Sequence, residues 1–188
     1  MSESFFQIAF TPAVLRAQEQ YNGRSHAGPA GEIEPYHFNE EEIAFIRERD
    51  SFYMSTVTET GWPYIQHRGG PRGFLKVLDD HTLGFADFRG NRQMLTVGNL
   101  AVNDRVVLFL MDYNRRERLK ILGHAKVVDA REDAELARKL TMPGYPAKVE
   151  RGVIIHVVAT DWNCPQHITP REVAGEAEGD GAGCEIID

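Results

Sequence analysis

The feature that most constrains the fold is a series of β-forming segments between residues 52 and 159 that are separated mainly by turn signals. The segments are rich in Val, Ile, Phe, Tyr and Thr, and Thr60-Gly61, Asp79-Asp80 and Asn114-Arg115-Arg116 stand between them. Such short turns can join antiparallel strands, whereas parallel strands need long crossovers. Because no strand–helix–strand alternation is sustained, the sequence favours a small antiparallel barrel over a doubly wound sheet.

The pattern predicts six or seven strands, and we expect a mainly β (α+β) fold with a six-stranded antiparallel barrel and peripheral helices. The expected strands cover residues 52–58, 62–66, 74–78, 82–86, 105–112, 119–128 and 153–159. Helices are expected over residues 12–21, 39–49, 92–101 and 131–140. The second of these helices begins with Asn39, and Glu42 three residues later is typical of a capping box.

The domain organisation follows from length and composition. A chain of 188 residues fits one domain. We expect a helix and loop extension over residues 1–38, the barrel domain over 39–172, and a disordered tail over 173–188, which is poor in apolar residues.

The longest apolar run, Val106 to Met111, is far shorter than the roughly 20 residues of a membrane span. No charged start of a signal peptide precedes Arg16, and only two Cys are present. These features predict a cytoplasmic protein without a membrane partner.

The charge is unevenly distributed along the chain. The net charge of −7 argues against a nucleic-acid partner, because coating a nucleic acid needs a broadly basic surface. Residues 66–120 nevertheless hold ten Lys/Arg and six Asp/Glu, a net +4 against −11 for the remainder. A local anion site and a solvated strand face explain this basic middle equally well.

A first motif, Gln66 to Pro71, reads Gln-His-Arg-Gly-Gly-Pro. Gly69 and Gly70 have no Cβ, so the backbone there can approach a ligand closely. Free N–H groups beside Arg68 would suit an anion or a polar ring. The alternative interpretation is a bulge or a wide hairpin turn.

A second motif, Asp87 to Gln93, leads through Gly90 and Asn91 into a predicted helix. The first N–H groups of that helix and the forked guanidinium of Arg92 suit a phosphate. The alternative interpretation is an exposed loop with Asn91 as the helix cap.

A third motif, Asp161 to His167, contains Cys164 and His167. A thiol beside a histidine can be reactive, but a metal would need three or four ligands, and no partner motif accompanies these two residues. We therefore expect a strand end that presents Trp162 and Gln166 to a ligand or a partner subunit, and assign no metal site. The dinucleotide, P-loop and hydrolase-elbow motifs are absent from the sequence, which disfavours those enzyme classes.

These motifs together resemble the FMN-binding split barrel of the pyridoxamine 5′-phosphate oxidase superfamily, and most of all its flavin-nucleotide-binding branch. The resemblance covers roughly residues 40–170. It rests on Trp62 to Pro71, Gly90-Asn91-Arg92 with Gly98-Asn99-Leu100, Leu108 to Tyr113 with Arg118-Leu119-Lys120, and residues 161–167.

The resemblance implies a homodimer that binds FMN at the subunit interface, with site residues in three groups. Along the isoalloxazine ring it places Gln66, His67, Arg68, Gly69 and Gly70. Near the phosphate it places Asp87, Gly90, Asn91, Arg92 and Gln93. Arg118 is expected to contact the partner's flavin, while Trp162, Gln166 and Arg171 are expected to be C-terminal contacts. Two departures from the family stand out, since a phosphate-binding Lys is missing and Asp87 replaces a Thr.

The function implied is that of an FMN-dependent oxidoreductase with a small-molecule electron donor or acceptor. His67 would donate a proton or simply line the ring, and Arg68 would stabilise the reduced flavin. The oxidase's Arg-x-His-x-Arg substrate clamp is replaced by the run His167 to Arg171, which argues against vitamin B6 oxidation. A non-catalytic flavin or haem binder is the alternative, and a ligand-free interaction module would require both glycine motifs to be incidental.

Overall fold

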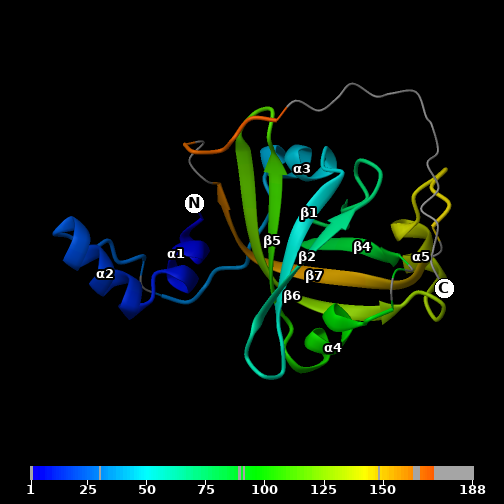
Figure 1. Ribbon diagram of the computed structural model, residues 1–188, viewed down its shortest axis with the longest axis horizontal. Helices are drawn as coiled ribbons and strands as arrows, with labels where there is room; N and C mark the ends of the chain where they lie inside the picture. Colours follow the sequence, from blue (N-terminus) through cyan, green and yellow to red (C-terminus); the bar gives the residue numbers. More distant parts are fainter. Residues whose placement is uncertain are drawn as a thin grey trace.

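A computed structural model describes residues 2–29, 31–88, 90, 92–147, 149–162 and 166–171. The described residues form one antiparallel sheet of seven strands in the order β2-β1-β5-β6-β7-β4-β3, and this sheet curls into a barrel (Figure 1). The antiparallel barrel is therefore confirmed, with one strand more than the six expected. The strands are β1 (Ser51–Val57), β2 (Pro63–Gly69), β3 (Lys76–Val77), β4 (Thr82–Phe88), β5 (Arg105–Asp112), β6 (Glu117–Asp129) and β7 (Val149–Trp162).

The barrel core takes alternate residues of β1, β5 and β6, as expected where one face of a sheet is buried, whereas β4 buries five consecutive residues. The aromatic centre is Phe52, whose ring stacks on Phe74 at 5.4 Å and meets the edge of Phe85 at 5.3 Å. Apolar side chains from five strands surround these rings, namely Met54, Leu83, Leu108, Leu110, Leu119, Ile121, Val153 and Ile155, all buried.

Three predictions near the glycine motifs need correction. β2 extends to Gly69, which pairs with Ser51, so the Gln66 motif lies within a strand and not beyond its end. The strand expected over 74–78 shrinks to Lys76–Val77, because Phe74 and Leu75 turn into the core. Asp87 belongs to β4 and not to the loop expected over 87–91.

The helices lie around the barrel and include one that the sequence pattern missed. Asn39 Oδ1 accepts from Glu42 N at 2.9 Å and Glu42 accepts from Asn39 N, which confirms the capping box. The described helices are α1 (Glu3–Ala9), α2 (Pro12–Asn22), α3 (Glu40–Arg47), α4 (Leu95–Val102) and α5 (Ala134–Leu140). α4 begins three residues later than predicted, because Arg92 and Met94 adopt left-handed backbone conformations at φ 60° and 56°.

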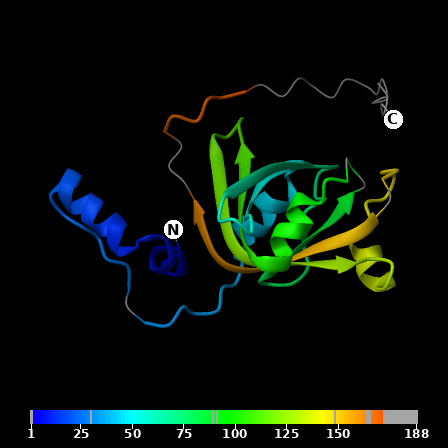
Figure 2. The ribbon, with the colours of Figure 1, turned by 60° about the horizontal axis from the view of Figure 1, so that its bottom comes forward.

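The first residues of the chain contact the barrel at β7. The hydroxyl of Ser2 donates to the carbonyl oxygen of Thr160 at 2.9 Å, and α1 packs beside β7. α2 buries no residue and projects from the barrel, as both views show (Figures 1 and 2). None of the described helices has the length and apolar character needed to cross a membrane. Cys164 and the tail expected over 173–188 lie outside the described residues.

Candidate functional site

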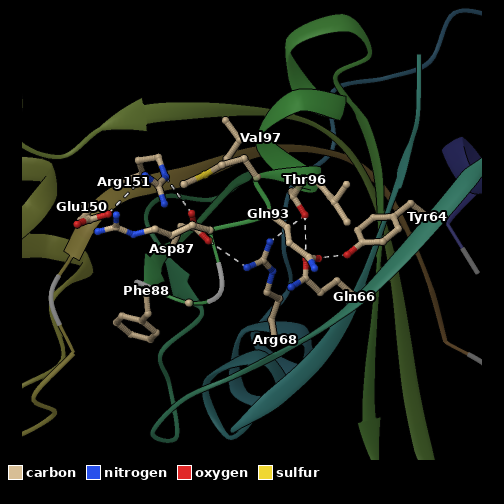
Figure 3. Close-up of a pocket in the computed structure, with 14 residues that line it drawn as sticks. Tyr64, Gln66, Arg68, Asp87, Phe88, Gln93, Thr96, Val97, Glu150 and Arg151 are labelled. Atoms are coloured by element: carbon tan, nitrogen blue, oxygen red, sulfur yellow. Dashed lines mark hydrogen bonds and ion pairs between the residues drawn. The ribbon is translucent and has the colours of Figure 1, made fainter. Parts of the chain in front are cut away.

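A polar cavity of about 200 Å³ lies where β2, β4, α4 and the start of β7 meet (Figure 3). Its polar walls carry three arginines and two carboxylates, and the apolar part comes from the start of α4. The lining residues are Tyr64, Gln66, Arg68, Asp87, Phe88, Gly90, Arg92, Gln93, Met94, Leu95, Thr96, Val97, Glu150 and Arg151.

Asp87 organises this cavity. Its carboxylate is buried and accepts from Arg68 Nη1 at 3.0 Å and from Arg151 Nε at 3.0 Å, so one anion holds two cations (Figure 3). Asp87 and Arg151 are also register partners between β4 and β7. The pairing of these strands therefore places Arg151 beside Asp87. The side chains of Arg68 and Arg151 are only 16% and 20% exposed.

The second anchor of Arg68 is Thr96, in the first turn of α4. Arg68 Nη2 donates to Thr96 Oγ1 at 2.9 Å, and this hydroxyl donates to Gln66 Oε1 at 3.2 Å (Figure 3). Tyr64 donates to the same Gln66 oxygen at 3.3 Å. Arg68 Nε is buried and has no hydrogen-bond partner within the part of the chain that the structure describes. A buried donor left in this state is a point where a ligand oxygen would be stabilised.

The start of α4 adds a second set of donors. The first N–H groups of a helix have no partner within the helix, and Leu95, Thr96 and Val97 occupy these positions beside the cavity. Met94 at the cap position makes no side-chain capping bond. With Arg92 also in the lining, the cavity combines a helix N-terminus with a guanidinium group, and this combination suits a phosphate.

Six of the predicted site residues meet in this cavity: Gln66, Arg68, Asp87, Gly90, Arg92 and Gln93. They come from two segments of the chain, residues 66–68 and residues 87–93. β4 and α4, which flank the second segment, bring it to the end of β2. Asn91 lies outside the described residues. The structure thus joins the first two sequence motifs into one site.

Three residues of the first motif do not line the cavity. Side chains along a strand alternate between its faces, so His67 points away from the face that carries Gln66 and Arg68, and it packs against Tyr53 at 5.5 Å. Gly70 has a packing role, because a Cβ there would lie 2.8 Å from the Phe74 ring. Catalysis by His67 and a ligand role for Gly69 and Gly70 stay predictions.

The remaining predicted contacts lie at the other end of the barrel. Arg118 on β6 pairs with Met111, and its guanidinium lies 5.9 Å from the Phe109 ring centre. Trp162 ends β7, eleven residues after Arg151, and Arg171 stacks over Tyr113 at 4.6 Å. Gln166 is exposed. Arg118, Trp162, Gln166 and Arg171 therefore do not reach the cavity of their own chain.

The sequence motifs missed four lining residues with polar side chains: Tyr64, Thr96, Glu150 and Arg151. Arg151 is the most important, because it shares the Asp87 carboxylate from 64 residues away. No local signal marks it, since only the pairing of β4 with β7 brings it to the site. Thr96 had a usable signal, namely a hydroxyl in the first turn of a predicted helix that follows a glycine loop.

Comparisons with known proteins agree with this architecture. A candidate pyridoxamine 5′-phosphate oxidase from Lactobacillus delbrueckii gives a TM-score of 0.51 at 20% identity, covering 66% of this chain and 93% of that chain. A variant of HupZ from Group A Streptococcus gives 0.51 at 17% identity, covering 66% of this chain and 98% of that chain. At such identities the likeness concerns the fold alone.

No curated protein matches the chain. The sequence profile described as pyridoxamine 5′-phosphate oxidase matches residues 38–159, which is well over half of the 188 residues and includes β1 to β6 and most of β7. On this match, the chain belongs to the pyridoxamine 5′-phosphate oxidase family.

Proposed function

We propose that this chain is an FMN-binding flavoprotein and acts as an oxidoreductase. The observation that carries the proposal is the joining of Arg68, Arg92 and Arg151 with the N-terminus of α4 in one cavity. Three guanidinium groups outnumber the carboxylates of Asp87 and Glu150 there. The surplus cation and the open helix N–H groups fit the phosphate of FMN.

The ring of the flavin fits less completely within one chain. A cavity of 200 Å³ is smaller than the roughly 300–1,000 Å³ of typical small-molecule sites. We place the phosphate in the cavity and the ring along β2, where the buried Nε of Arg68, which has no partner among the described residues, offers a donor to a flavin oxygen or nitrogen. The rest of the ring then needs cover from outside the chain.

When bound, FMN supplies the electron transfer chemistry, and the protein orients it and sets its electrostatic surroundings. Arg68 is held by Asp87 and Thr96, so its charge stays in place without reorganisation during reduction. Tyr64 and Thr96 orient the Gln66 amide by donating to its oxygen. Gln66 can then direct its amide N–H groups towards a polar edge of the ring.

We propose a homodimer that completes this site. Tyr53, Ile65 and Val107 form an apolar patch on the outer face of β2, β1 and β5, and each is more than a third exposed. Ser55 pairs with both Ile65 and Val107, so these positions are neighbours across the three strands. A patch of this kind marks an interaction surface. His67 lies on the same face of the sheet. Any contact of its imidazole ring with a flavin is therefore with the flavin of the partner subunit.

The phosphate assignment predicts the effect of Arg92→Ala. We expect FMN affinity to fall by about 1.5–3 kcal/mol, the range for a hydrogen bond to a charged group, or roughly ten- to hundredfold. Riboflavin affinity should not change, because riboflavin lacks the phosphate. Quenching of flavin fluorescence during titration measures both affinities. Arg138→Ala, which removes an exposed arginine of α5, is the charge-matched control. Equal affinity of the unaltered protein for FMN and riboflavin would contradict the assignment.

The dimer proposal predicts the mass in solution. Light scattering at micromolar concentration should give twice the 21.2 kDa of one chain. Val107→Glu should shift the protein towards monomer and weaken FMN binding together, because a charge in the apolar patch opposes burial. A monomer that binds FMN tightly would show that one chain suffices and that the shared site is wrong.

A further inference from the structure

A second polar cluster lies away from the cavity, at the β3–β4 turn. The Asp80 carboxylate lies between two imidazole rings: its Oδ2 is 2.8 Å from His37 Nδ1 and its Oδ1 is 2.6 Å from His81 Nδ1. The potential ligand atoms of these three residues all lie within 4.8 Å of one another. His37 comes from the segment before α3, 43 residues from Asp80 in the sequence.

The backbone around this cluster is held by hydrogen bonds to neighbouring elements. Phe38 N donates to the carbonyl oxygen of Asp80 at 2.7 Å, which ties the segment before α3 to the turn. The carbonyl oxygen of His81 accepts from Val157 N on β7 at 2.8 Å. The side chain of Asp79 accepts from His81 N at 3.0 Å. The side chains are free to adjust, but their points of attachment are fixed together.

We propose that His37, Asp80 and His81 bind a divalent transition metal of the Zn²⁺ class. Two imidazole nitrogens and one carboxylate oxygen form a donor set that suits Zn²⁺, whereas Ca²⁺ and Mg²⁺ prefer oxygen ligands alone. The ion would replace the hydrogen bonds that now join the carboxylate to the two rings. His37 and Asp80 are about 60% exposed, so at least one coordination position remains open to water.

The geometry makes this ion a link between the N-terminal extension and the barrel. His37 belongs to the segment that precedes α3, and the other two ligands belong to the turn between β3 and β4. The cluster adjoins Thr82, the first residue of β4, while Asp87 and the flavin cavity lie at the other end of that strand. Metal binding should therefore stabilise the fold and leave FMN affinity unchanged.

Calorimetric titration of tag-free, chelator-treated protein with Zn²⁺ tests the proposal. We expect one equivalent per chain, and a loss of at least tenfold in affinity for His37→Ala, His81→Ala and Asp80→Asn. His124→Ala is the matched control, because His124 Nδ1 lies 3.0 Å from Asp104 Oδ2 in an isolated pair. Co²⁺, used as a second probe, should give visible absorption that the His37→Ala variant lacks.

A thermal readout separates a bound ion from a surface association. Zn²⁺ at a hundredfold excess over its dissociation constant should raise Tm by about 5–10 °C in the unaltered protein. His81→Ala should abolish that rise and keep the same circular dichroism spectrum. Absence of stoichiometric binding, or binding that persists in His37→Ala and His81→Ala, would overturn the proposal. FMN titration in the same samples tests the flavin site separately.

Discussion

Asp87→Ala is expected to lower the free energy of unfolding of the FMN-free protein by about 3 kcal/mol, at the low end of the range for breaking a buried ion pair. The carboxylate is the shared partner of Arg68 and Arg151, so its loss removes the ion pair of the largely buried Arg68 and leaves Arg151 with Glu150 alone, at 3.6 Å. Their remaining exposure to water keeps the cost from being larger. Urea denaturation followed by circular dichroism measures the change.

FMN should reverse part of this loss. In the variant, the phosphate would supply part of the negative charge that Arg68 and Arg151 have lost, so added FMN should raise the urea midpoint more than in the unaltered protein. Glu135→Ala provides the control, since the Glu135–Lys139 pair is exposed and water screens its charges, so it contributes little to stability. If Asp87→Ala lowers the free energy of unfolding no more than Glu135→Ala does, the Asp87 carboxylate does not hold the site together.

The second large effect concerns the substrate, and we expect negligible oxidation of pyridoxamine or pyridoxine 5′-phosphate. These substrates need a positive clamp for their own phosphate, separate from the one that binds FMN. The matching segment offers only Arg171, which is stacked on Tyr113, and burial of Ile168 fixes the chain nearby. Pro170 restricts Thr169 to an extended conformation, so the segment cannot curl as a helical clamp would. Losing one charge-assisted contact lowers affinity by about ten- to hundredfold, and losing the whole clamp should abolish turnover.

Anaerobic bleaching of the bound flavin with each B6 phosphate in excess checks this expectation. The flavin should keep its visible absorption with either phosphate, and dithionite should bleach it, which shows that the cofactor can be reduced. Rapid bleaching by a B6 phosphate, with pyridoxal 5′-phosphate formed on reoxidation in air, would mean that the missing clamp was misread.

Local patterns in the sequence predicted most of the barrel. β5 begins and ends where the apolar run and its flanking residues indicate, over Arg105–Asp112. The α3 capping box needs only four consecutive residues, so it could be identified without knowledge of the fold. α1 was missed because its seven residues carry two adjacent phenylalanines and no helical periodicity, and its place against β7 depends on Ser2 and Thr160.

The site was less predictable because its parts meet only through long-range pairing. Arg68, Asp87 and Arg92 lie in recognisable motifs, but Arg151 lies within an ordinary strand sequence and acquires its role from its register with Asp87. The start of α4 depends on left-handed conformations at Arg92 and Met94, which residues of these types seldom adopt. Because β2 continues to Gly69, the alternation of side chains along the strand places His67 on the face opposite Gln66.

The pairing of β4 with β7 also sets the order in which the protein can assemble. β4 ends at Phe88 and its partner begins at Val149, so β4 gains that neighbour only after some 60 further residues have been synthesised. The hydrogen bond of Ser2 forms later still, because its acceptor is the carbonyl oxygen of Thr160. Contacts so distant in sequence form slowly. During synthesis, β4 can therefore join the strands that precede it only through β7, so Arg68, Asp87 and Arg151 come together, and the polar cavity becomes complete, only when the last strand is in place.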